Sequence, residues 1–356
     1  MHNLSNLPKL TYNYFQITLV FNTSTTYRKN MTHKTNSTTT RLLHFLGQRS
    51  IRFSRLFARI LAGFVNIVHS TKTSKTIRLN IEICLPQYNR QQREYITQAA
   101  IRNELQSYFE FFAIWGSSST KNISRIRKIQ GESYFHEALA QGKGLVLIVP
   151  HFGTWEIMNA WVAQHTQMTI MYKPIKNEDA DAFVKAARSR EQAHLVPTDE
   201  SGVRQIFKAL KQGGTTVILP DHTPHVGGDM VDYFGIPLAS SSLSAKLIQK
   251  TKARTVLLYA IRCEDSDQFD LFIEPISEDI YQGSAEHGTH VIHQTLEHLI
   301  ERYPEHYHWS YKRFKAHPEL RRLYNLPHKE AMQLIEKIRT ENLMNQQNTL
   351  EIDSAE

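Results

Sequence analysis

The sequence predicts an α/β protein with a mostly parallel central sheet. Short continuous apolar runs recur from residue 144 onward, as expected of strands that are buried on both faces. Stretches with a helical spacing of apolar residues separate these runs, and strands that alternate with helices form a parallel sheet covered by helices. A hydrophobic content of 41% over 356 residues is enough for the core of one such domain with extensions at its ends.

Residues 1–40 differ in composition from the rest of the chain. Residues 21–40 are rich in Ser, Thr and Asn, and such a segment cannot bury a core. The preceding run LTYNYFQITLVF is too short to cross a bilayer and lacks a signal-peptide cleavage pattern. We expect residues 1–40 to be a disordered leader, and this composition leaves open whether translation starts at Met31.

The next segment, residues 41–70, is predicted to be an amphipathic helix. Its polar residues recur at helical steps and form one narrow stripe, whereas Phe, Leu and Ile fill a wide opposite face. The stripe consists of Arg41, His44, Gln48, Arg52, Arg55, Arg59 and Asn66. No run here reaches the roughly 18 apolar residues of a membrane-spanning helix. A basic helix of this kind is typical of membrane interfaces, and the alternative is that it packs on the core of its own domain.

The elements of the α/β body follow in order. A helix is expected over residues 90–115, with Leu105, Tyr108, Phe109 and Phe112 on its apolar edge. Strands are predicted at residues 144–149, 168–172, 215–219, 254–261 and 269–276. Further helices are predicted at residues 154–165, 178–191, 201–212, 240–251 and 286–303.

The order of these elements also predicts the domain limits. Only RCEDSDQ separates the last two strands, so we expect them to form an antiparallel hairpin at the sheet edge. The α/β domain is predicted to span residues 71–325. A polar C-terminal tail, mainly one helix, is predicted over residues 326–356.

Charge and cysteine content limit the partners. The formal net charge of +8 favours an anionic partner, such as a lipid headgroup surface, an acidic protein or a nucleic acid. No helix-turn-helix, RRM or zinc-finger pattern is visible, so we expect no nucleic-acid partner. Cys84 and Cys263 lack metal-ligand spacing, and His222 and His225 have no third ligand at a suitable spacing. We therefore predict neither a metal nor a cofactor.

The motif HFGTWE (residues 151–156) carries the chemistry. It follows the strongest predicted strand, and ligands of open α/β sheets bind beyond the carboxyl ends of strands. We expect Thr154 to cap a helix and to place Glu156 in its first turn. From there the carboxylate can accept from one nitrogen of His151 and leave the other nitrogen free as a general base. A structural histidine at a strand end is the alternative interpretation.

Such a pair needs no nucleophilic Ser or Cys when the substrate brings its own hydroxyl. The base removes the hydroxyl proton as the oxygen attacks a carbonyl, and the backbone amides at and near Gly153 are the candidate donors to the oxyanion. A serine hydrolase is disfavoured, because no GxSxG elbow exists and GSSST (residues 116–120) follows a helix. The P-loop pattern GxxxxGK[ST] is absent as well.

HFGTWE closely resembles the HFGNWE-type block of the bacterial lipid A late acyltransferases, the lauroyl/myristoyl acyltransferase family. That family uses a His and an acidic residue with four residues between them. Other blocks that resemble the family occur in its order: RLNIEICLP (78–86), MYKPIKN (171–177), ARSRE (187–191), the run 209–235 and YHWSYKRFK (307–315). The resemblance spans about residues 41–320, with Lys173 in place of the usual Arg and Tyr233 where Phe is common.

The resemblance implies a glycerolipid-acyltransferase-like αβ sandwich and an acyltransferase with His151 and Glu156 as its catalytic pair. It also implies an acyl carrier protein thioester as donor and an acylated lipid A precursor as acceptor, at the cytoplasmic face of the bacterial inner membrane. A lysophospholipid, an ornithine lipid or a glycolipid is the alternative acceptor. Acyl chain length, the acylation step and the oligomeric state do not follow from the sequence.

Five more residues are candidate substrate contacts. Arg188 and Arg190 belong to the ARSRE block and suit phosphate or carrier contacts, with a solvated basic face as the alternative. Asp221 follows a predicted strand, where either a site residue or a turn residue is expected. Lys173 lacks the bidentate fork of arginine, so a phosphate or carboxylate contact there would differ. Arg313 is expected either in a structural pair or at a lipid headgroup.

Overall fold

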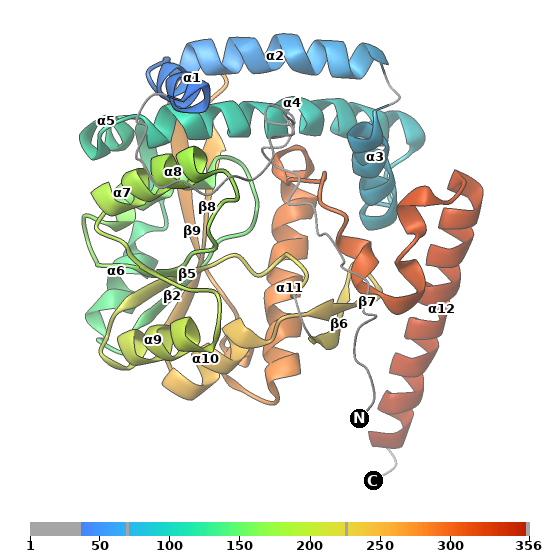
Figure 1. Cartoon of the computed structure of the whole chain (residues 1–356). Helices are drawn as coiled ribbons and strands as arrows, with labels where there is room; N and C mark the ends of the chain where they lie inside the picture. The colour runs from blue at the N-terminus through green and yellow to red at the C-terminus, as the bar shows by residue number, and fades with distance from the viewer. Residues whose placement is uncertain (1–36, 69–70, 225–226, 354–356) are drawn as a thin grey trace, which may run out of the picture. The chain divides into compact units, whose positions relative to one another are not determined.

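A computed structural model describes residues 37–68, 71–224 and 227–353 of the chain. Almost all of the predicted leader, and His225, lie outside the described residues. The described part is an α/β fold with a mostly parallel central sheet, as predicted (Figure 1). Every strand predicted from an apolar run is present, within one or two residues of its expected ends.

The helices are α1 (Thr38–Gly47), α2 (Ile51–Val68), α3 (Lys72–Cys84), α4 (Arg90–Trp115), α5 (Ser119–Ile123), α6 (Glu132–Ala140), α7 (Met158–Val162), α8 (Glu178–Arg190), α9 (Glu200–Lys211), α10 (Leu243–Thr251), α11 (Ala285–Arg302) and α12 (His328–Asp353). The strands are β1 (Ile126–Gln130), β2 (Leu145–Ile148), β3 (Thr169–Met171), β4 (His194–Val196), β5 (Thr215–Ile218), β6 (Asp229–Tyr233), β7 (Ile236–Ser240), β8 (Arg254–Arg262) and β9 (Phe269–Pro275).

The central sheet has the strand order β1-β9-β8-β2-β5. β2 pairs in parallel with both β5 and β8, whereas β8 and β9 are antiparallel. β1 pairs in parallel with β9 and therefore lies outside it. The β8–β9 hairpin was predicted correctly, but its predicted place at the sheet edge is wrong. β1 takes that edge, and its IRKIQ sequence mixes charged and apolar residues because an edge strand is only partly buried.

The two faces of the sheet are covered by different hydrophobic clusters. Val146 and Ile148 of β2 face one cluster, which includes residues of α3, α11 and α12. Leu145 and Leu147 face the other cluster, which includes residues of α6 and α7. This alternation buries β2 on both sides and makes its carboxyl end a rigid platform.

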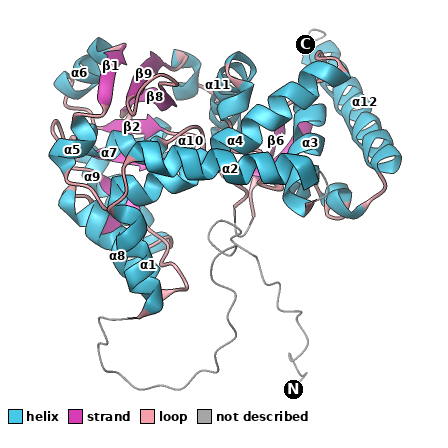
Figure 2. Cartoon of the chain, turned by 90° about the horizontal axis from the view of Figure 1, so that it is seen from above, coloured by secondary structure: helices cyan, strands magenta, loops and turns pink. Residues whose placement is uncertain are grey.

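The segment predicted as one amphipathic helix forms two helices, α1 and α2, which are separated by residues 48–50. Figures 1 and 2 both show α2 lying along α4. None of the described helices combines the length and the apolar character that are needed to cross a bilayer. The sequence predicted a polar tail for the residues of α12. In the structure this helix packs on the domain, because Ala331, Ile335 and Ile338 are buried in the core.

Candidate active site

His151 lies just beyond the carboxyl end of β2, in a loop that the C-terminal segment holds in place. Phe152 forms an isolated antiparallel bridge with Tyr307, and the amide of His308 donates to the carbonyl of His151 at 3.0 Å. The His151 side chain is 21% exposed, so a substrate can reach it from outside. The loop therefore fixes the backbone of this histidine and leaves its ring accessible.

Asp221 is the acidic partner of His151. It follows β5, and because β5 is the parallel neighbour of β2, the carboxyl ends of both strands meet. Asp221 Oδ1 lies 2.8 Å from His151 Nδ1, and Oδ2 accepts from the His151 amide at 3.0 Å and from the Tyr307 hydroxyl at 3.1 Å. Since a carboxylate only accepts, Nδ1 carries the proton and Nε2 keeps its lone pair.

The environment keeps Asp221 charged. Its side chain is fully buried, and burial alone would raise the pKa of this carboxyl. The charge of His151 and the hydrogen bonds from its ring and amide outweigh burial and hold the pKa of Asp221 well below its usual value. The pair is therefore an anion that orients an imidazole.

A stack of rings fixes the plane of the His151 imidazole. The His222 ring lies parallel to it, with 3.7 Å between centroids and an angle of 2°, and Tyr311 stacks on the far side of His222 at 3.8 Å. Burial, together with the charge of His151, lowers the pKa of His222 well below its usual value. His222 is thus a neutral ring stacked on His151, and the Trp155 ring lies at 75° to the imidazole with 5.1 Å between centroids.

The predicted hydrogen bond between Glu156 and His151 is wrong. Glu156 instead accepts from Trp115 Nε1 at 2.9 Å, from Asn159 Nδ2 at 3.0 Å and from Arg188 Nη2 at 2.9 Å. The backbone explains the difference, because it turns through Gly153 at φ +54° and continues as the 3-10 helix η1 (Trp155–Ile157). Glu156 therefore points toward α4 and α8 and not back toward the loop.

Two further expectations for this loop are also wrong. Thr154 makes no capping hydrogen bond, and its hydroxyl donates to Glu110. The amide of Gly153 donates to the carbonyl of His306 at 2.8 Å, and the amide of Phe152 donates to Pro150 at 2.8 Å. These amides are occupied and do not face an oxyanion in this conformation.

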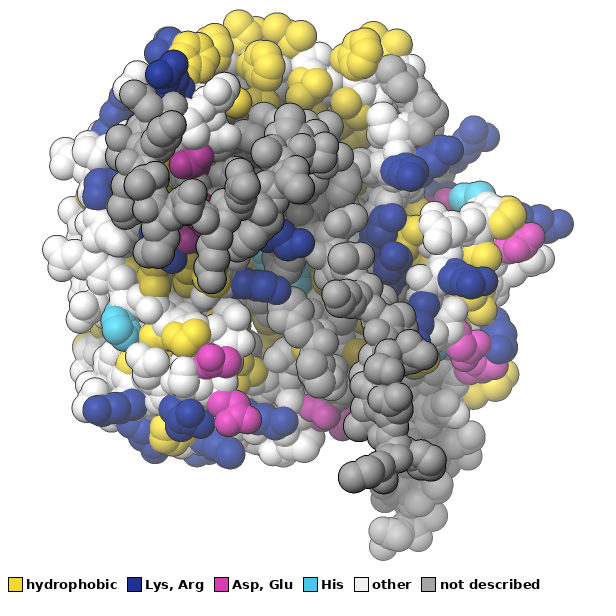
Figure 3. Space-filling model, viewed as in Figure 1, with side chains coloured by type: hydrophobic (Ala, Val, Ile, Leu, Met, Phe, Trp, Pro, Cys, Tyr) yellow, Lys and Arg dark blue, Asp and Glu magenta, His cyan; other side chains and the backbone are white. Residues whose placement is uncertain are grey.

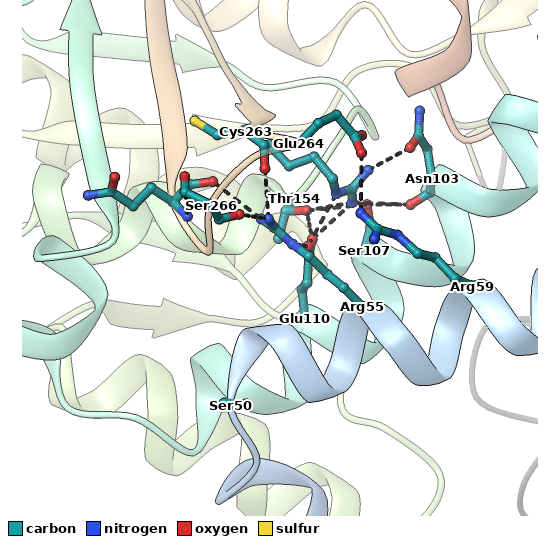
Figure 4. A network of polar contacts seen from close by, with 12 residues as sticks. Ser50, Arg55, Arg59, Asn103, Ser107, Glu110, Thr154, Cys263, Glu264 and Ser266 are labelled. Atoms are coloured by element: carbon teal, nitrogen blue, oxygen red, sulfur yellow. Dashed lines mark hydrogen bonds and ion pairs between the residues drawn. The ribbon is translucent and has the colours of Figure 1, made fainter.

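Thr154 belongs to a buried network of charges that joins four parts of the fold (Figure 4). Glu110 of α4 pairs with Arg262 of β8 at 2.9 Å and with Arg55 of α2 at 2.6 Å. Burial by itself would raise the pKa of Glu110, but the two arginines lower it below its usual value. The network ties the HFGTWE loop to the centre of the sheet and to α2.

A second buried acid approaches the site from α4. Glu104 accepts from the hydroxyls of Ser310 and Tyr108. Burial raises its pKa to about 6 in spite of these bonds. The charge of His151 lowers this pKa only slightly, less than the hydrogen bonds do.

The other predicted site residues are spread over the fold. Arg188 lies beside Glu156, and its Nε–H is buried with no hydrogen-bond partner among the described residues. Arg190 is exposed and donates to the carbonyl of Trp115 at 2.6 Å. Lys173 is exposed just beyond β3. Arg313 is only 3% exposed and bonds Ser240 Oγ at 2.6 Å and the Ala239 carbonyl at 3.1 Å, which makes it an internal support of β7.

Several functional neighbours were not foreseen from the sequence. Glu110 and Trp115 lie in the helix predicted over residues 90–115 and carry no motif of their own, whereas Tyr307 begins the YHWSYKRFK block without any sign that it contacts Asp221. A signal existed for Arg262, since a cation that ends the apolar run RTVLLYAIR needs a buried partner. In the part of the chain that the structure describes, no three ligand atoms of the site lie close enough to hold a metal ion.

Comparisons with known proteins agree with this architecture. The family model of bacterial lipid A biosynthesis acyltransferases matches residues 27–316. The chain is 24% identical over 269 residues to a lipid A biosynthesis acyltransferase of Haemophilus influenzae, which covers 73% of this chain and 81% of that protein. It is 23% identical to the lipid A biosynthesis palmitoleoyltransferase of Escherichia coli K12 (78% and 86% covered) and 22% identical to the lauroyltransferase of the same strain (70% and 81%).

Proposed function

This chain belongs to the bacterial lipid A biosynthesis acyltransferase family, and from that premise we propose that it transfers a fatty acyl chain from an acyl carrier protein thioester to a hydroxyl of an acylated lipid A precursor. The observation that supports this chemistry best is His151, whose Nδ1 is 2.8 Å from a buried carboxylate and whose side chain is partly exposed. An oriented imidazole that is partly open to solvent is what an alcohol acceptor needs.

In the proposed reaction His151 Nε2 takes the proton of the acceptor hydroxyl as its oxygen attacks the thioester carbonyl. The tetrahedral intermediate then collapses, the carbon–sulfur bond breaks, and the thiolate receives that proton from the imidazolium. Asp221 stabilises the imidazolium and holds its orientation. Such a base contributes on the order of 100- to 10,000-fold in rate.

We assign Glu156 a positioning role in place of the expected contact with His151. Its carboxylate holds Arg188 at 2.9 Å, and the Nε–H of that arginine has no partner among the described residues. A buried donor of this kind suits a substrate oxygen, either on the thioester or on a headgroup phosphate. Glu156 thus acts through Arg188.

Mass spectrometry of lipid A tests the proposed function. Deletion of the gene is expected to remove one acyl chain from lipid A, and re-expression of the chain is expected to restore it. The mass of the missing chain gives its length, and the precursor that accumulates identifies the acylation step. Unchanged lipid A together with an altered lysophospholipid, ornithine-lipid or glycolipid profile would instead favour one of the alternative acceptors.

We also propose that α2 binds the surface of the inner membrane from the cytoplasmic face. Its inward face carries Ser54, Arg55 and Ala58 beside the apolar Ile51, so most of its large apolar side chains do not face the core. Its outward surface is mainly apolar: Leu56, Ile60, Phe64 and Ile67 are 59–79% exposed, and Arg52 and Arg59 are exposed beside them. Figure 3 shows apolar side chains gathered along this edge of the molecule. Such a surface favours an interfacial position in lipid.

The double substitution Ile60→Glu/Phe64→Glu is expected to weaken binding to phosphatidylglycerol-containing vesicles by at least about 100-fold, since each buried side chain contributes roughly 1.5 kcal/mol or more. Vesicle co-sedimentation measures this loss. The control Phe207→Glu/Met230→Glu changes two exposed apolar residues of α9 and β6 and is expected to bind like the parent. Equal binding by all three proteins would show that α2 is not the docking surface.

A further inference from the structure

A cluster of possible metal ligands lies on helix α6 and in the turn that follows α7, apart from the site described above. Glu132 and His136 are four residues apart on α6 and therefore share a face. His165 follows α7, and the ligand atoms of all three side chains lie within 4.8 Å of one another. We propose that Glu132, His136 and His165 bind a divalent metal ion of the zinc class.

The spacing of the first two ligands suits a tetrahedral ion. His136 Nε2 lies 3.3 Å from Glu132 Oε1. Bonds of about 2.0–2.1 Å to zinc place neighbouring ligand atoms of a tetrahedron about 3.3–3.4 Å apart. A ring nitrogen of His165 lies within 4.8 Å of both atoms, so this exposed side chain moves toward the ion on binding. The same 3.3 Å also fits an ordinary ion pair, so the position of the third ligand carries the argument.

Buried aromatic residues lie against both imidazoles and limit their range of positions. The His165 ring lies 4.7 Å from Trp161 and 4.9 Å from His136, and the His136 ring lies 5.6 Å from Phe135. Phe135 and Trp161 are 0% and 4% exposed, so they form a fixed floor under the cluster. Ligands that are held before binding lose less conformational freedom, which favours affinity.

The donor set selects the class of metal. Two imidazole nitrogens and one carboxylate oxygen suit zinc and the late first-row ions, whereas magnesium and calcium require mainly oxygen ligands. Glu132 and His136 keep nearly half of their side-chain surface exposed, 45% and 47%, so a fourth position is open to water. A bound ion would join the helix that leads into β2 to the turn after α7, on the same face of the sheet.

Metal titration of the untagged full chain, first stripped of metal by a chelator, tests this proposal. Calorimetry with Zn²⁺ is expected to show one tight equivalent, and Co²⁺ is expected to give the visible absorption of a tetrahedral site. Glu132→Gln is expected to weaken binding at least 10-fold, and His136→Ala/His165→Ala to abolish that equivalent. A 100-fold excess of Zn²⁺ over its Kd is expected to raise the parent's Tm by about 3 °C or more, but not that of the double variant.

The matched control is His194→Ala/His287→Ala, which removes two exposed histidines of other elements and is expected to keep the tight equivalent. Circular dichroism in chelator checks that every variant folds like the parent. If the His136→Ala/His165→Ala variant binds Zn²⁺ like the parent, or if the parent shows no tight equivalent, the cluster is only a surface ion pair and the proposal fails.

Discussion

Replacing His151 with alanine is expected to lower the rate of acyl transfer by about 100- to 10,000-fold, because the substitution removes the general base. A radiolabelled or mass-spectrometric assay with acyl carrier protein thioester and purified lipid A precursor measures the loss. Binding of the donor is expected to change much less, since donor binding does not depend on the imidazole lone pair.

A loss of activity in the His151→Ala protein can come from the missing base or from a disturbed structure, and thermal unfolding distinguishes the two. His151 supports Asp221 and the stacked ring of His222, so the thermal transition of the variant must be compared with that of the parent. His194→Ala removes an exposed histidine on β4 and serves as the matched control. Normal turnover by a folded His151→Ala protein would show that another group is the base.

Asp221→Asn is expected to lower turnover by about 100-fold or more, because it changes which ring nitrogen of His151 carries the proton. Oδ2 of Asp221 accepts from both the His151 amide and the Tyr307 hydroxyl, so the amide oxygen of asparagine must take that position. The amide nitrogen then faces Nδ1 of His151 and donates to it. The ring must carry its proton on Nε2, and the base is lost while the shape of the site is kept.

Glu156→Gln is the informative comparison with Asp221→Asn. Glutamine can still accept from Arg188, so we expect a smaller loss, mainly in substrate binding. Steady-state kcat and KM for both variants distinguish the two roles. Because the pKa of Asp221 is held well below its usual value, an acid limb of the rate profile above pH 4 belongs to another group. If Glu156→Gln is the more damaging change to kcat, the pairing predicted from the sequence is the functional one.

The sequence predicted the place of His151 in the fold better than it predicted the contacts of this residue. His151 was predictable because a continuous apolar run forces β2 into the middle of the sheet, and the motif begins where that run ends. The position of Asp221 followed from the same rule on the neighbouring strand. The pairing of Asp221 with His151 was not predictable, because that contact depends on how two loops, 70 residues apart in the sequence, are placed relative to each other.

The orientation of α2 was likewise only half predictable. The spacing of Arg52, Arg55 and Arg59 gave the polar stripe, but not the direction in which it points. Of these three, only Arg55 points inward, to Glu110, which lies 55 residues further along the chain and carries no local signal. Arg52 and Arg59 are exposed. The β6–β7 hairpin was missed because its turn is Phe234-Gly235, and only the structure shows both residues with positive φ, 52° and 75°.

The bridge between Phe152 and Tyr307 has a consequence for the synthesis of the protein. The proposed base, its acidic partner and the stacked histidine are all translated by residue 222, yet the residues that hold them, Tyr307, His308 and Tyr311, are added some 90 residues later. A nascent chain on the ribosome, or a product of premature termination in that interval, carries His151, Asp221 and His222 without the C-terminal residues that align them. Competence for acyl transfer is therefore reached only near the end of translation.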